Sequence, residues 1–256
     1  MKRNLKQSLR VVIPSRKRVD ILGRSAIHLF PNATLCIAEE ELEDYQPAFP
    51  DNEIVTHPDD VIGIVPVRQW ILDNFDDEAI CMVDDDVYKV IGLIGIRPIT
   101  FHDPADVLRI VQNAANIAFG IGAPIFGFSQ VWADPRKFRA MDPFSFTSWV
   151  GLVIGLIGRS LSYDSKLRLR DDVDICLQAM LTQRITYQDQ RFSFMMRDRI
   201  GTPGGGAVSR SKERDDFEIN YLHKKWGKHL QYRLGKGQYT CSVQVNRRQK
   251  MTELRK

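Results

Sequence analysis

The amino-acid sequence predicts an α/β protein with a mixed, mainly parallel β-sheet that is flanked by helices. Three observations support this fold class. Short apolar runs alternate with helical patterns through the first half of the 256-residue chain, as they do in β-α-β units. The run at 79–83 is apolar throughout, as expected for a strand that is covered on both faces. The hydrophobic fraction of 43% is enough for a sizeable core.

The elements of the first half follow from these apolar runs and from the residues that end them. Pro14 ends the first strand, and His57-Pro58 ends the third. We expect strands at 9–13, 34–38, 53–56 and 79–83, with helices at 19–29 and 67–75.

The pattern becomes less regular after residue 86. We expect helices at 104–118, 171–184 and 215–229, and strands at 124–132, 151–157 and 185–188. The glycine-rich stretch Thr202–Gly206 is either a lid over the site or a plain surface loop. We therefore expect a core at residues 1–200 and a basic C-terminal segment at 201–256, packed on the same domain and carrying the lid loop.

Charge is unevenly distributed along the chain. The net charge is +4, and residues 201–256 carry thirteen Lys and Arg against five Asp and Glu. This segment is therefore +8, and residues 1–200 sum to −4. Such a distribution fits either a solvated basic face or a surface that meets the phosphates of a nucleotide or a nucleic acid.

Nothing in the sequence indicates export or membrane insertion. Met1–Arg10 is basic and polar, without the apolar run of a signal peptide behind it. The longest apolar stretch, Trp149–Gly158, has ten residues and three glycines, whereas about 20 residues are needed to cross a bilayer. We expect a cytoplasmic protein without a membrane partner. The four scattered cysteines are expected in the core rather than in a zinc site or a disulfide framework: Cys36, Cys81, Cys176 and Cys241.

Three consecutive carboxylates, Asp84, Asp85 and Asp86, follow the buried strand at 79–83. Ligands bind beyond the carboxyl ends of strands in open α/β sheets, so these carboxylates are expected at the mouth of a site. Mg²⁺ and Mn²⁺ prefer oxygen ligands and leave positions open for phosphate oxygens. On a strand-like segment Asp84 and Asp86 would point to the same side. The alternative interpretation is a plain acidic loop.

Basic residues follow the first strand at the same edge of the expected sheet. Beyond Pro14, Arg16 and Arg18 are candidates for binding phosphates or the carboxylates of the metal site. Ser15 is a candidate for bonding a nucleobase or a ribose, or for capping the next helix. Arg68 begins the helix that precedes the triplet and is expected to reach the site edge.

A second acidic motif, Asp171-Asp172-Val173-Asp174, runs into an apolar helix. Acidic residues at a helix N-terminus complement its dipole, which accounts for one carboxylate. Three carboxylates within four positions are more than the capping of one helix requires. The alternative is a general base that takes the proton of an acceptor hydroxyl.

The order of these motifs resembles the GT-A glycosyltransferases over residues 9–190. The segments that carry the resemblance are V-V-I-P-S-R, the Arg-led helix, I-C-M-V-D-D-D and D-D-V-D-I-C-L-Q-A. The resemblance implies a Rossmann-like GT-A fold, a nucleotide-sugar donor with a UDP-sugar favoured, and Mn²⁺ or Mg²⁺. It implies that Asp86 is the direct metal ligand and that Asp84 touches the metal, the ribose or the sugar hydroxyls.

The same resemblance implies Asp172 as the base, with Asp171 and Asp174 orienting the acceptor or the helix. Asp171 stands where the family more often has Glu, so the choice between Asp171 and Asp172 as base stays open. A late histidine often completes the metal shell in this family. His223 is the first candidate for it and His229 the second.

Further residues complete the expected site. Pro14, Asp85 and Lys225 are assigned to the donor, and Trp149 and Gly205 to the acceptor. Trp226 is either a packing anchor or a platform on which a base or sugar ring stacks.

The V-V-I-P-S-R start and the late G-G-G and K-W-G elements are similar to the phage and TET/JBP-associated glycosyltransferases. Members of that group glycosylate hydroxymethylated bases, which implies modified DNA as the acceptor. Acceptors that are saccharides or proteins stay open, as do the oligomeric state and inversion or retention at the anomeric carbon. A nucleotidyltransferase and a non-catalytic nucleic-acid-binding protein are the competing classes. A nucleotidyltransferase usually has a Gly-rich loop after the first strand, which this sequence lacks. A non-catalytic binding protein would leave both acidic motifs unexplained.

Overall fold

A computed structural model describes residues 9–94, 97–129, 142–197, 211–235, 238–243 and 245. The strands are β1 (Leu9–Pro14), β2 (Thr34–Ala38), β3 (Ile54–His57), β4 (Ala79–Val83), β5 (Val87–Ile94), β6 (Arg97–Phe101), β7 (Ile125–Ser129), β8 (Phe144–Ser145), β9 (Val153–Ile157), β10 (Tyr187–Met196), β11 (Leu230–Gly235) and β12 (Gln238–Val243). The helices are α1 (Val19–Gly23), α2 (Ala26–Leu29), α3 (Leu42–Ala48), α4 (Ile64–Asn74), α5 (Pro104–Ile121), α7 (Asp171–Thr182) and α8 (Lys212–Trp226), with short 3₁₀ turns η1 (Glu39–Glu41) and η3 (Gly227–His229).

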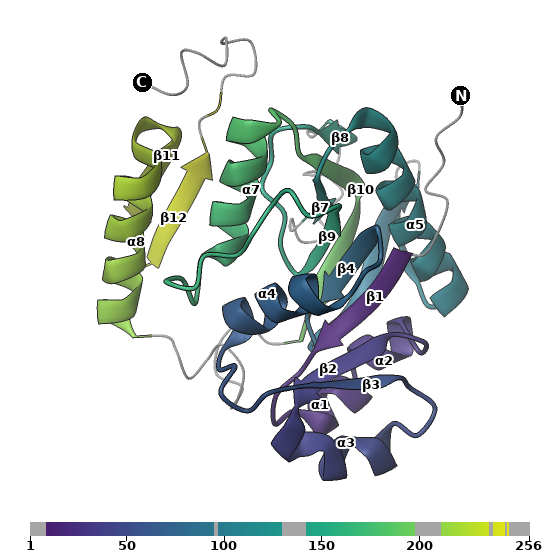
Figure 1. The fold of residues 1–256 in the computed structure, drawn as a ribbon. Helices are drawn as coiled ribbons and strands as arrows, with labels where there is room; N and C mark the ends of the chain where they lie inside the picture. Colours follow the sequence, from purple (N-terminus) through teal and green to yellow (C-terminus); the bar gives the residue numbers. More distant parts are fainter. Residues whose placement is uncertain are drawn as a thin grey trace.

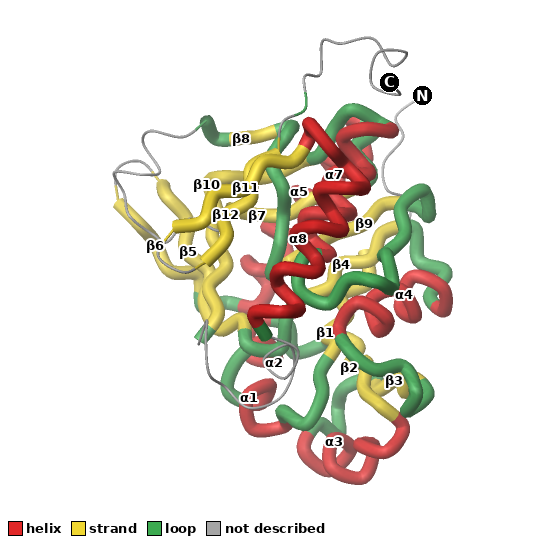
Figure 2. Tube along the Cα trace, turned by 90° about the vertical axis from the view of Figure 1, so that its left-hand side faces the viewer, coloured by secondary structure: helices red, strands yellow, loops and turns green. Residues whose placement is uncertain are grey.

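One ten-stranded mixed sheet runs through the molecule in the order β3-β2-β1-β4-β9-β7-β10-β5-β6, with β8 paired to β10 (Figure 1 and Figure 2). Its first half, β3-β2-β1-β4, is parallel. β9 then enters antiparallel between β4 and β7. The mixed sheet with flanking helices confirms the predicted fold class. The parallel pairing also brings the carboxyl ends of β1 and β4 to one edge, where the first two motifs begin.

Successive side chains of the central strands point to opposite faces of the sheet. The core therefore has two halves, one on each face. Ile80 and Met82 of β4 pack with residues of α4, α7 and α8. Cys81 and Val83 of the same strand pack on the other face with residues of α1, α2, α3 and α5. All five residues of β4 are buried, as its sequence predicts. Figure 1 shows β12 between α7 and α8.

Three cysteines, Cys36, Cys81 and Cys176, are buried with free thiols, which confirms the core assignment for these three. The side chain of Cys241 lies outside the described residues.

Several boundaries differ from the predicted ones. The helix expected at 19–29 is broken into α1 and α2, because the chain turns at Arg24 and Ser25. The hairpin of β5 and β6 was not predicted, and β10 extends to Met196 instead of ending near 188. The two are connected, since β10 pairs antiparallel with β5 along its second half. The hairpin of β11 and β12 was also not predicted.

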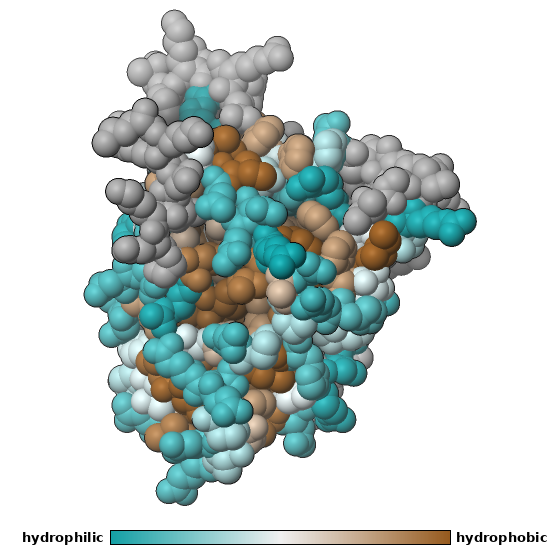
Figure 3. Space-filling model, turned by 90° about the vertical axis from the view of Figure 1, so that its right-hand side faces the viewer, coloured by the Kyte–Doolittle hydropathy of each residue, from teal (hydrophilic) through white to brown (hydrophobic). Residues whose placement is uncertain are grey.

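The outside of the molecule mixes hydrophilic and apolar side chains. On the face where α5 lies, brown apolar groups show between teal hydrophilic ones (Figure 3). Ile117 and Ile121 of α5 are among the exposed large hydrophobic residues. Within the described part of the chain, no helix combines the length and the apolar character that a bilayer span requires.

Gly155 of β9 permits the closest approach in the described core. A Cβ at this position would lie 2.0 Å from Cε1 and Cζ of the Phe126 ring. We expect Gly155→Ala to destabilise the protein by about 1–3 kcal/mol, because the buried ring must shift. Gly120→Ala in α5 is the matched control, since nothing lies within 4 Å of its Cβ position. That variant should stay within about 1 kcal/mol of wild type. Urea unfolding measures both, and equal midpoints for the two variants would contradict the expectation.

Candidate active site

The acidic triplet forms a tight turn between β4 and β5. The backbone N–H of Val87 donates to the carbonyl oxygen of Asp84 at 3.2 Å, and the N–H of Asp84 donates to the carbonyl oxygen of Leu152 at 3.0 Å. The expected strand-like triplet is therefore wrong in its local geometry, because the chain bends at once to enter β5. Asp84 and Asp85 consequently turn to different partners.

Arg68 of α4 joins the two acidic motifs. Its Nη2 donates to Oδ1 of Asp84 at 2.6 Å, and its Nη1 donates to Oδ2 of Asp171 at 2.6 Å. The Arg68 residue is 5% exposed. Burial alone would lower the pKa of Arg68, but the two carboxylates raise it above its ordinary value. Motifs that are 87 positions apart in the sequence thus meet at one guanidinium.

Asp85 ties the acidic turn to the turn after β1. Ser15 Oγ donates to Oδ2 of Asp85 at 2.8 Å, and Arg18 Nη1 donates to Oδ1 at 3.0 Å. The hydroxyl of Tyr45 lies 2.8 Å from Ser15 Oγ and accepts from the N–H of Arg18 at 3.1 Å. Burial raises the pKa of Asp85, while Arg18 and Ser15 oppose the shift. Ser15 and Asp85, which were assigned to the donor, are thus bonded to each other in this state.

Asp86 has the least satisfied carboxylate of the triplet. Its Oδ2 lies 3.8 Å from Arg18 Nη1, and its Oδ1 is buried without a hydrogen-bond partner among the described residues. Burial, followed by the charges of Asp84 and Asp85, raises the pKa of Asp86 to about 7. A buried, orphaned carboxylate oxygen among further carboxylates fits a hard divalent cation, which supplies the missing positive charge.

The histidines expected near the metal lie on the C-terminal elements. His223 is exposed on α8, and His229 is buried in η3. The described residues contain no group of three His, Cys, Asp or Glu side chains arranged to hold a metal ion. His223 therefore does not complete a three-residue cluster with Asp84 and Asp86 in this structure.

The second motif occupies the first turn of α7, as predicted. Asp171 is buried and held by Arg68, whereas Asp172 is only partly buried. One oxygen of Asp172 accepts from the neighbouring N–H of Val173 at 2.8 Å. Burial, and then the charge of Asp171, raises the pKa of Asp172 to about 7. Among the described residues no arginine forms an ion pair with Asp172, and a carboxylate with a pKa near 7 suits a general base.

Asp174 and Lys225 contact each other at 2.8 Å between Nζ and Oδ1. Trp226 Nε1 donates to the same oxygen of Asp174 at 2.7 Å, and Lys225 Nζ also lies 2.7 Å from Oδ2 of Asp164. Trp226 packs against the core beside α7, as a packing anchor does. The acceptor assignment of Asp174 and the donor assignment of Lys225 thus fall on residues that connect α7 to α8.

The remaining expected site residues are dispersed. Pro14 ends β1. Nη2 of Arg16 lies 3.6 Å from Oε1 of Glu40, and its Nε lies 3.8 Å from Oε1 of Glu41. Trp149 is partly buried in the segment before β9, and its carbonyl oxygen accepts from Gln188. Gly205 and the whole expected lid at 202–206 lie outside the described residues.

Some residues of the site were not anticipated from the sequence. Tyr45 lies on α3, and no pattern in the sequence connects it to Ser15. Glu218 of α8 is completely buried, and the only sequence signal was its i, i+4 spacing from Arg214. Both act through contacts between distant parts of the chain.

The chain is similar to known glycosyltransferases in sequence and in fold. Residues 9–205 match the family of TET-associated glycosyltransferases. The β-glucosyl-HMC-α-glucosyl-transferase of Enterobacteria phage T2 is 23% identical over 236 residues, which cover 85% of this chain and 81% of that protein.

Two solved structures are also similar. Glucosyl-3-phosphoglycerate synthase from Mycobacterium tuberculosis, in complex with Mn²⁺, UDP and glucosyl-3-phosphoglycerate, has a TM-score of 0.51 at 13% identity, covering 94% of this chain and 88% of that one. TarS from S. aureus, residues 1–349, in complex with UDP-GlcNAc, has a TM-score of 0.47 at 12% identity over 84% of this chain. The present chain spans 65% of that TarS chain.

The likeness to the synthase confirms the GT-A fold. The family match covers the turn after β1, Arg68 and both acidic motifs, which are the parts that converge here. The chain belongs to the TET-associated glycosyltransferase family.

Proposed function

We propose that this glycosyltransferase moves a sugar from a UDP-sugar to a hydroxyl group on modified DNA, with Asp172 as the general base. The observation that carries the proposal is the bridge from Asp84 through Arg68 to Asp171, because it joins a donor-side motif to an acceptor-side motif. Membership of a glycosyltransferase family leaves the nucleotidyltransferase and the non-catalytic binding protein without support.

The proposed reaction is a direct displacement at the anomeric carbon. Asp172 takes the proton of the acceptor hydroxyl as its oxygen forms a bond to that carbon. The bond from the anomeric carbon to the diphosphate oxygen breaks, and its electron pair leaves with UDP. Arg18, whose Nη1 lies 3.8 Å from Oδ2 of Asp86, would stabilise the departing diphosphate, where negative charge grows.

Asp86, with Asp84 beside it, would hold a divalent cation. Such an ion stabilises negative charge on the leaving diphosphate oxygens when it is bound. The orphaned Oδ1 of Asp86 supports the assignment. The synthase of the same fold was solved with Mn²⁺ and UDP.

Substitution of Asp86, the proposed metal ligand, gives a testable prediction. We expect Mn²⁺ with UDP to raise the melting temperature of wild type and to leave that of Asp86→Asn nearly unchanged, because the variant lacks the orphaned oxygen's charge. Differential scanning fluorimetry with Mn²⁺ and UDP, each alone and together, measures the shift. Asp106→Asn on the exposed side of α5 is the matched control and should shift as wild type does. An equal shift for Asp86→Asn would contradict the metal assignment.

The acceptor follows from the relative in phage T2, whose name specifies α-glucosyl transfer to β-glucosyl-HMC. This supports DNA that carries hydroxymethylated pyrimidines as the acceptor class. It also favours a second candidate acceptor, a sugar hydroxyl on a base that is already glucosylated. In the first candidate the hydroxymethyl oxygen of the base would face Asp172, and in the second a hydroxyl of the glucose that is already attached.

Mass analysis of nucleosides tests both acceptors. Purified protein with Mn²⁺ would be given UDP-glucose, UDP-GlcNAc or other nucleotide sugars with three duplexes. These contain unmodified cytosine, 5-hydroxymethylcytosine or its β-glucosylated form. The proposal expects one hexose or N-acetylhexosamine to be added to a modified duplex only. Turnover of a donor with transfer to none of the duplexes would refute the DNA acceptor while leaving the donor assignment in force.

A further inference from the structure

Helix α8 presents a fully buried carboxylate to the segment that precedes α7. Glu218 is 0% exposed, and its oxygens accept the backbone N–H groups of Arg168 at 2.7 Å, Leu169 at 3.0 Å and Arg170 at 3.1 Å. The Nε–H of Arg214 donates to the same carboxylate at 2.7 Å. Successive backbone N–H groups form a concavity that binds an anion, and here a side chain from another helix fills it.

This segment leads directly into the first turn of α7. Arg170 is the N-cap residue of α7, and no side chain caps the helix there. A negative charge near a helix N-terminus also complements the helix dipole. Glu218 therefore holds the N-cap residue and the two residues before it, and fixes the backbone immediately before Asp171 and Asp172.

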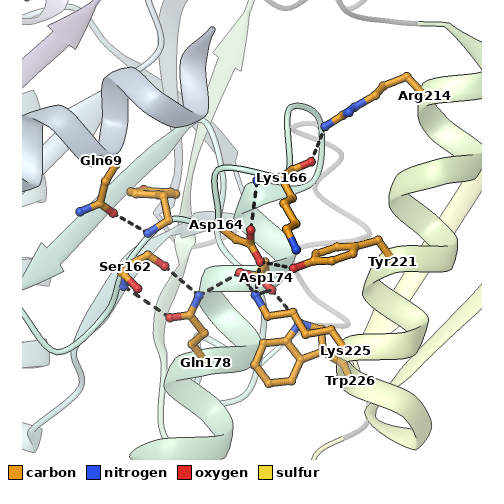
Figure 4. Close-up of polar contacts among 11 residues, drawn as sticks. Gln69, Ser162, Asp164, Lys166, Asp174, Gln178, Arg214, Tyr221, Lys225 and Trp226 are labelled. Carbon is orange, nitrogen blue, oxygen red and sulfur yellow. Dashed lines mark hydrogen bonds and ion pairs between the residues drawn. The ribbon is translucent and has the colours of Figure 1, made fainter. Parts of the chain in front are cut away.

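The other end of α8 makes a second connection, one turn further along α7. Trp226 and Lys225 both bond to the carboxylate of Asp174, which is 1% exposed. Figure 4 shows these two side chains pointing from α8 to Asp174, with Gln178 donating from within α7. The hydroxyl of Tyr221 on α8 donates at 2.7 Å to Asp164, in the loop that precedes α7.

The two connections lie on either side of Asp172. The Glu218 contacts end at Arg170, two residues before it, and the Asp174 contacts begin two residues after it. The carboxylate of Asp172 bonds only to the N–H of Val173 among the described residues. Its position therefore depends on the backbone of the first turn, and that backbone is held by α8.

We propose that Glu218 is a positioning residue for Asp172, acting through the backbone of residues 168–170. The inference rests on the proposed role of Asp172 as the base. It assigns the C-terminal helix a part in catalysis although no residue of that helix needs to touch the substrate.

Glu218→Gln tests the proposal. The amide retains the size of the side chain but replaces one accepting oxygen with an NH₂ group that opposes the backbone donors. We expect kcat for sugar transfer to fall about 100-fold, the cost of a small misplacement of a reacting group. The donor site lies on β1, β4 and α4, so KM for the UDP-sugar should change by no more than about twofold.

A double-mutant cycle separates positioning from a general loss of structure. In the Asp172→Asn background, Glu218→Gln should cause little further loss of the residual rate, because the group that it positions is already gone. Glu213→Gln on the exposed face of α8 is the matched control and should leave kcat unchanged. If Glu218→Gln does not fold, Trp226→Phe replaces it, since it keeps a smaller aromatic ring in place and removes the N–H that reaches Asp174. We expect about a 10-fold loss of kcat for that variant.

The outcomes keep the two proposals distinct. Full activity of Asp172→Asn would refute the base, and with it the proposed function of this residue. If Asp172→Asn is slow, an unchanged kcat in Glu218→Gln would overturn the positioning role alone. The same fold loss from Glu218→Gln in both backgrounds would also overturn it.

Discussion

Asp172→Asn is expected to lower kcat for sugar transfer about 10²- to 10⁴-fold, the usual contribution of a positioned general base. The amide retains the shape of the side chain and its bond from Val173 but cannot take the acceptor proton. Binding of the donor should not change, because the proposed donor residues follow β1 and β4, whereas Asp172 lies in the first turn of α7. Single-turnover transfer measures the rate, and calorimetry measures the affinity for UDP. Asp106→Asn is the control and should retain wild-type kcat. Wild-type kcat in Asp172→Asn would mean that another group is the base.

The pH dependence follows from the same residue. Burial raises the pKa of Asp172 to about 7, so wild-type kcat should decline as the pH falls below 7 and the base becomes protonated. Asp172→Asn should lack this decline when saturating Mn²⁺ keeps Asp86, whose pKa is also raised to about 7, ionised.

The free energy of unfolding should fall as the pH rises, whereas kcat should rise. The folded pKa of Asp172 lies above its ordinary value of 3.8, so the stabilisation from its bound proton is lost as the pH rises from about 4 to about 7. Asp172→Asn should therefore be more stable than wild type at pH 8, with the difference vanishing near pH 4. Such a gain on loss of a catalytic group is the usual trade-off between stability and activity.

Arg68→Met is expected to destabilise the protein by about 3–5 kcal/mol, because it removes the partner of two carboxylates in a poorly solvated site. Asp84 and Asp171 would each lose a bond of 2.6 Å. Their mutual repulsion would also separate the two motifs, so transfer activity should be lost in the protein that still folds. Urea denaturation followed by circular dichroism measures the change in the free energy of unfolding.

Arg109→Met on α5 is the matched control. Its ion pair with Asp106 is exposed, with 72% and 47% of the two side chains accessible, and such pairs contribute about 0–1 kcal/mol. Replacing both Asp84 and Asp171 with Asn in the Arg68→Met protein should recover part of the lost stability. An unfolding midpoint equal to that of Arg109→Met would show that Arg68 does not hold the motifs together.

The sequence was most informative where a local pattern determines the structure. The continuous apolar run of β4 predicted a strand buried on both faces, and the acidic start of α7 predicted a helix at 171. The meeting of the turn after β1 with the turn after β4 was predictable because the carboxyl ends of parallel strands share an edge. The second acidic motif follows the antiparallel strand β9, so this rule does not explain its arrival at the site. The partner of each carboxylate was less evident. Arg68 was expected near the site, but its simultaneous bonds to two aspartates depend on the packing of α4 against α7.

The parts that sequence reasoning missed depend on long-range pairing. The strand β5 was concealed because the triplet resembled the end of a sheet element, whereas it is a turn into a hairpin. Asp174 and Lys225 resembled ligand-binding residues by type, yet each satisfies the charge of the other. A buried charge requires a partner wherever the chain supplies one, and residue type alone does not reveal which partner it has.

The far edge of the sheet has a consequence for solubility. Among the described strands, β6 is the last in the sheet order, and a strand at a sheet edge invites pairing with another molecule. Arg97 and Pro98 occupy this strand and are exposed. Proline has no N–H to offer to an incoming strand, and arginine adds a charge that such a strand would have to bury. The chain thereby discourages edge-to-edge aggregation at the end of the sheet.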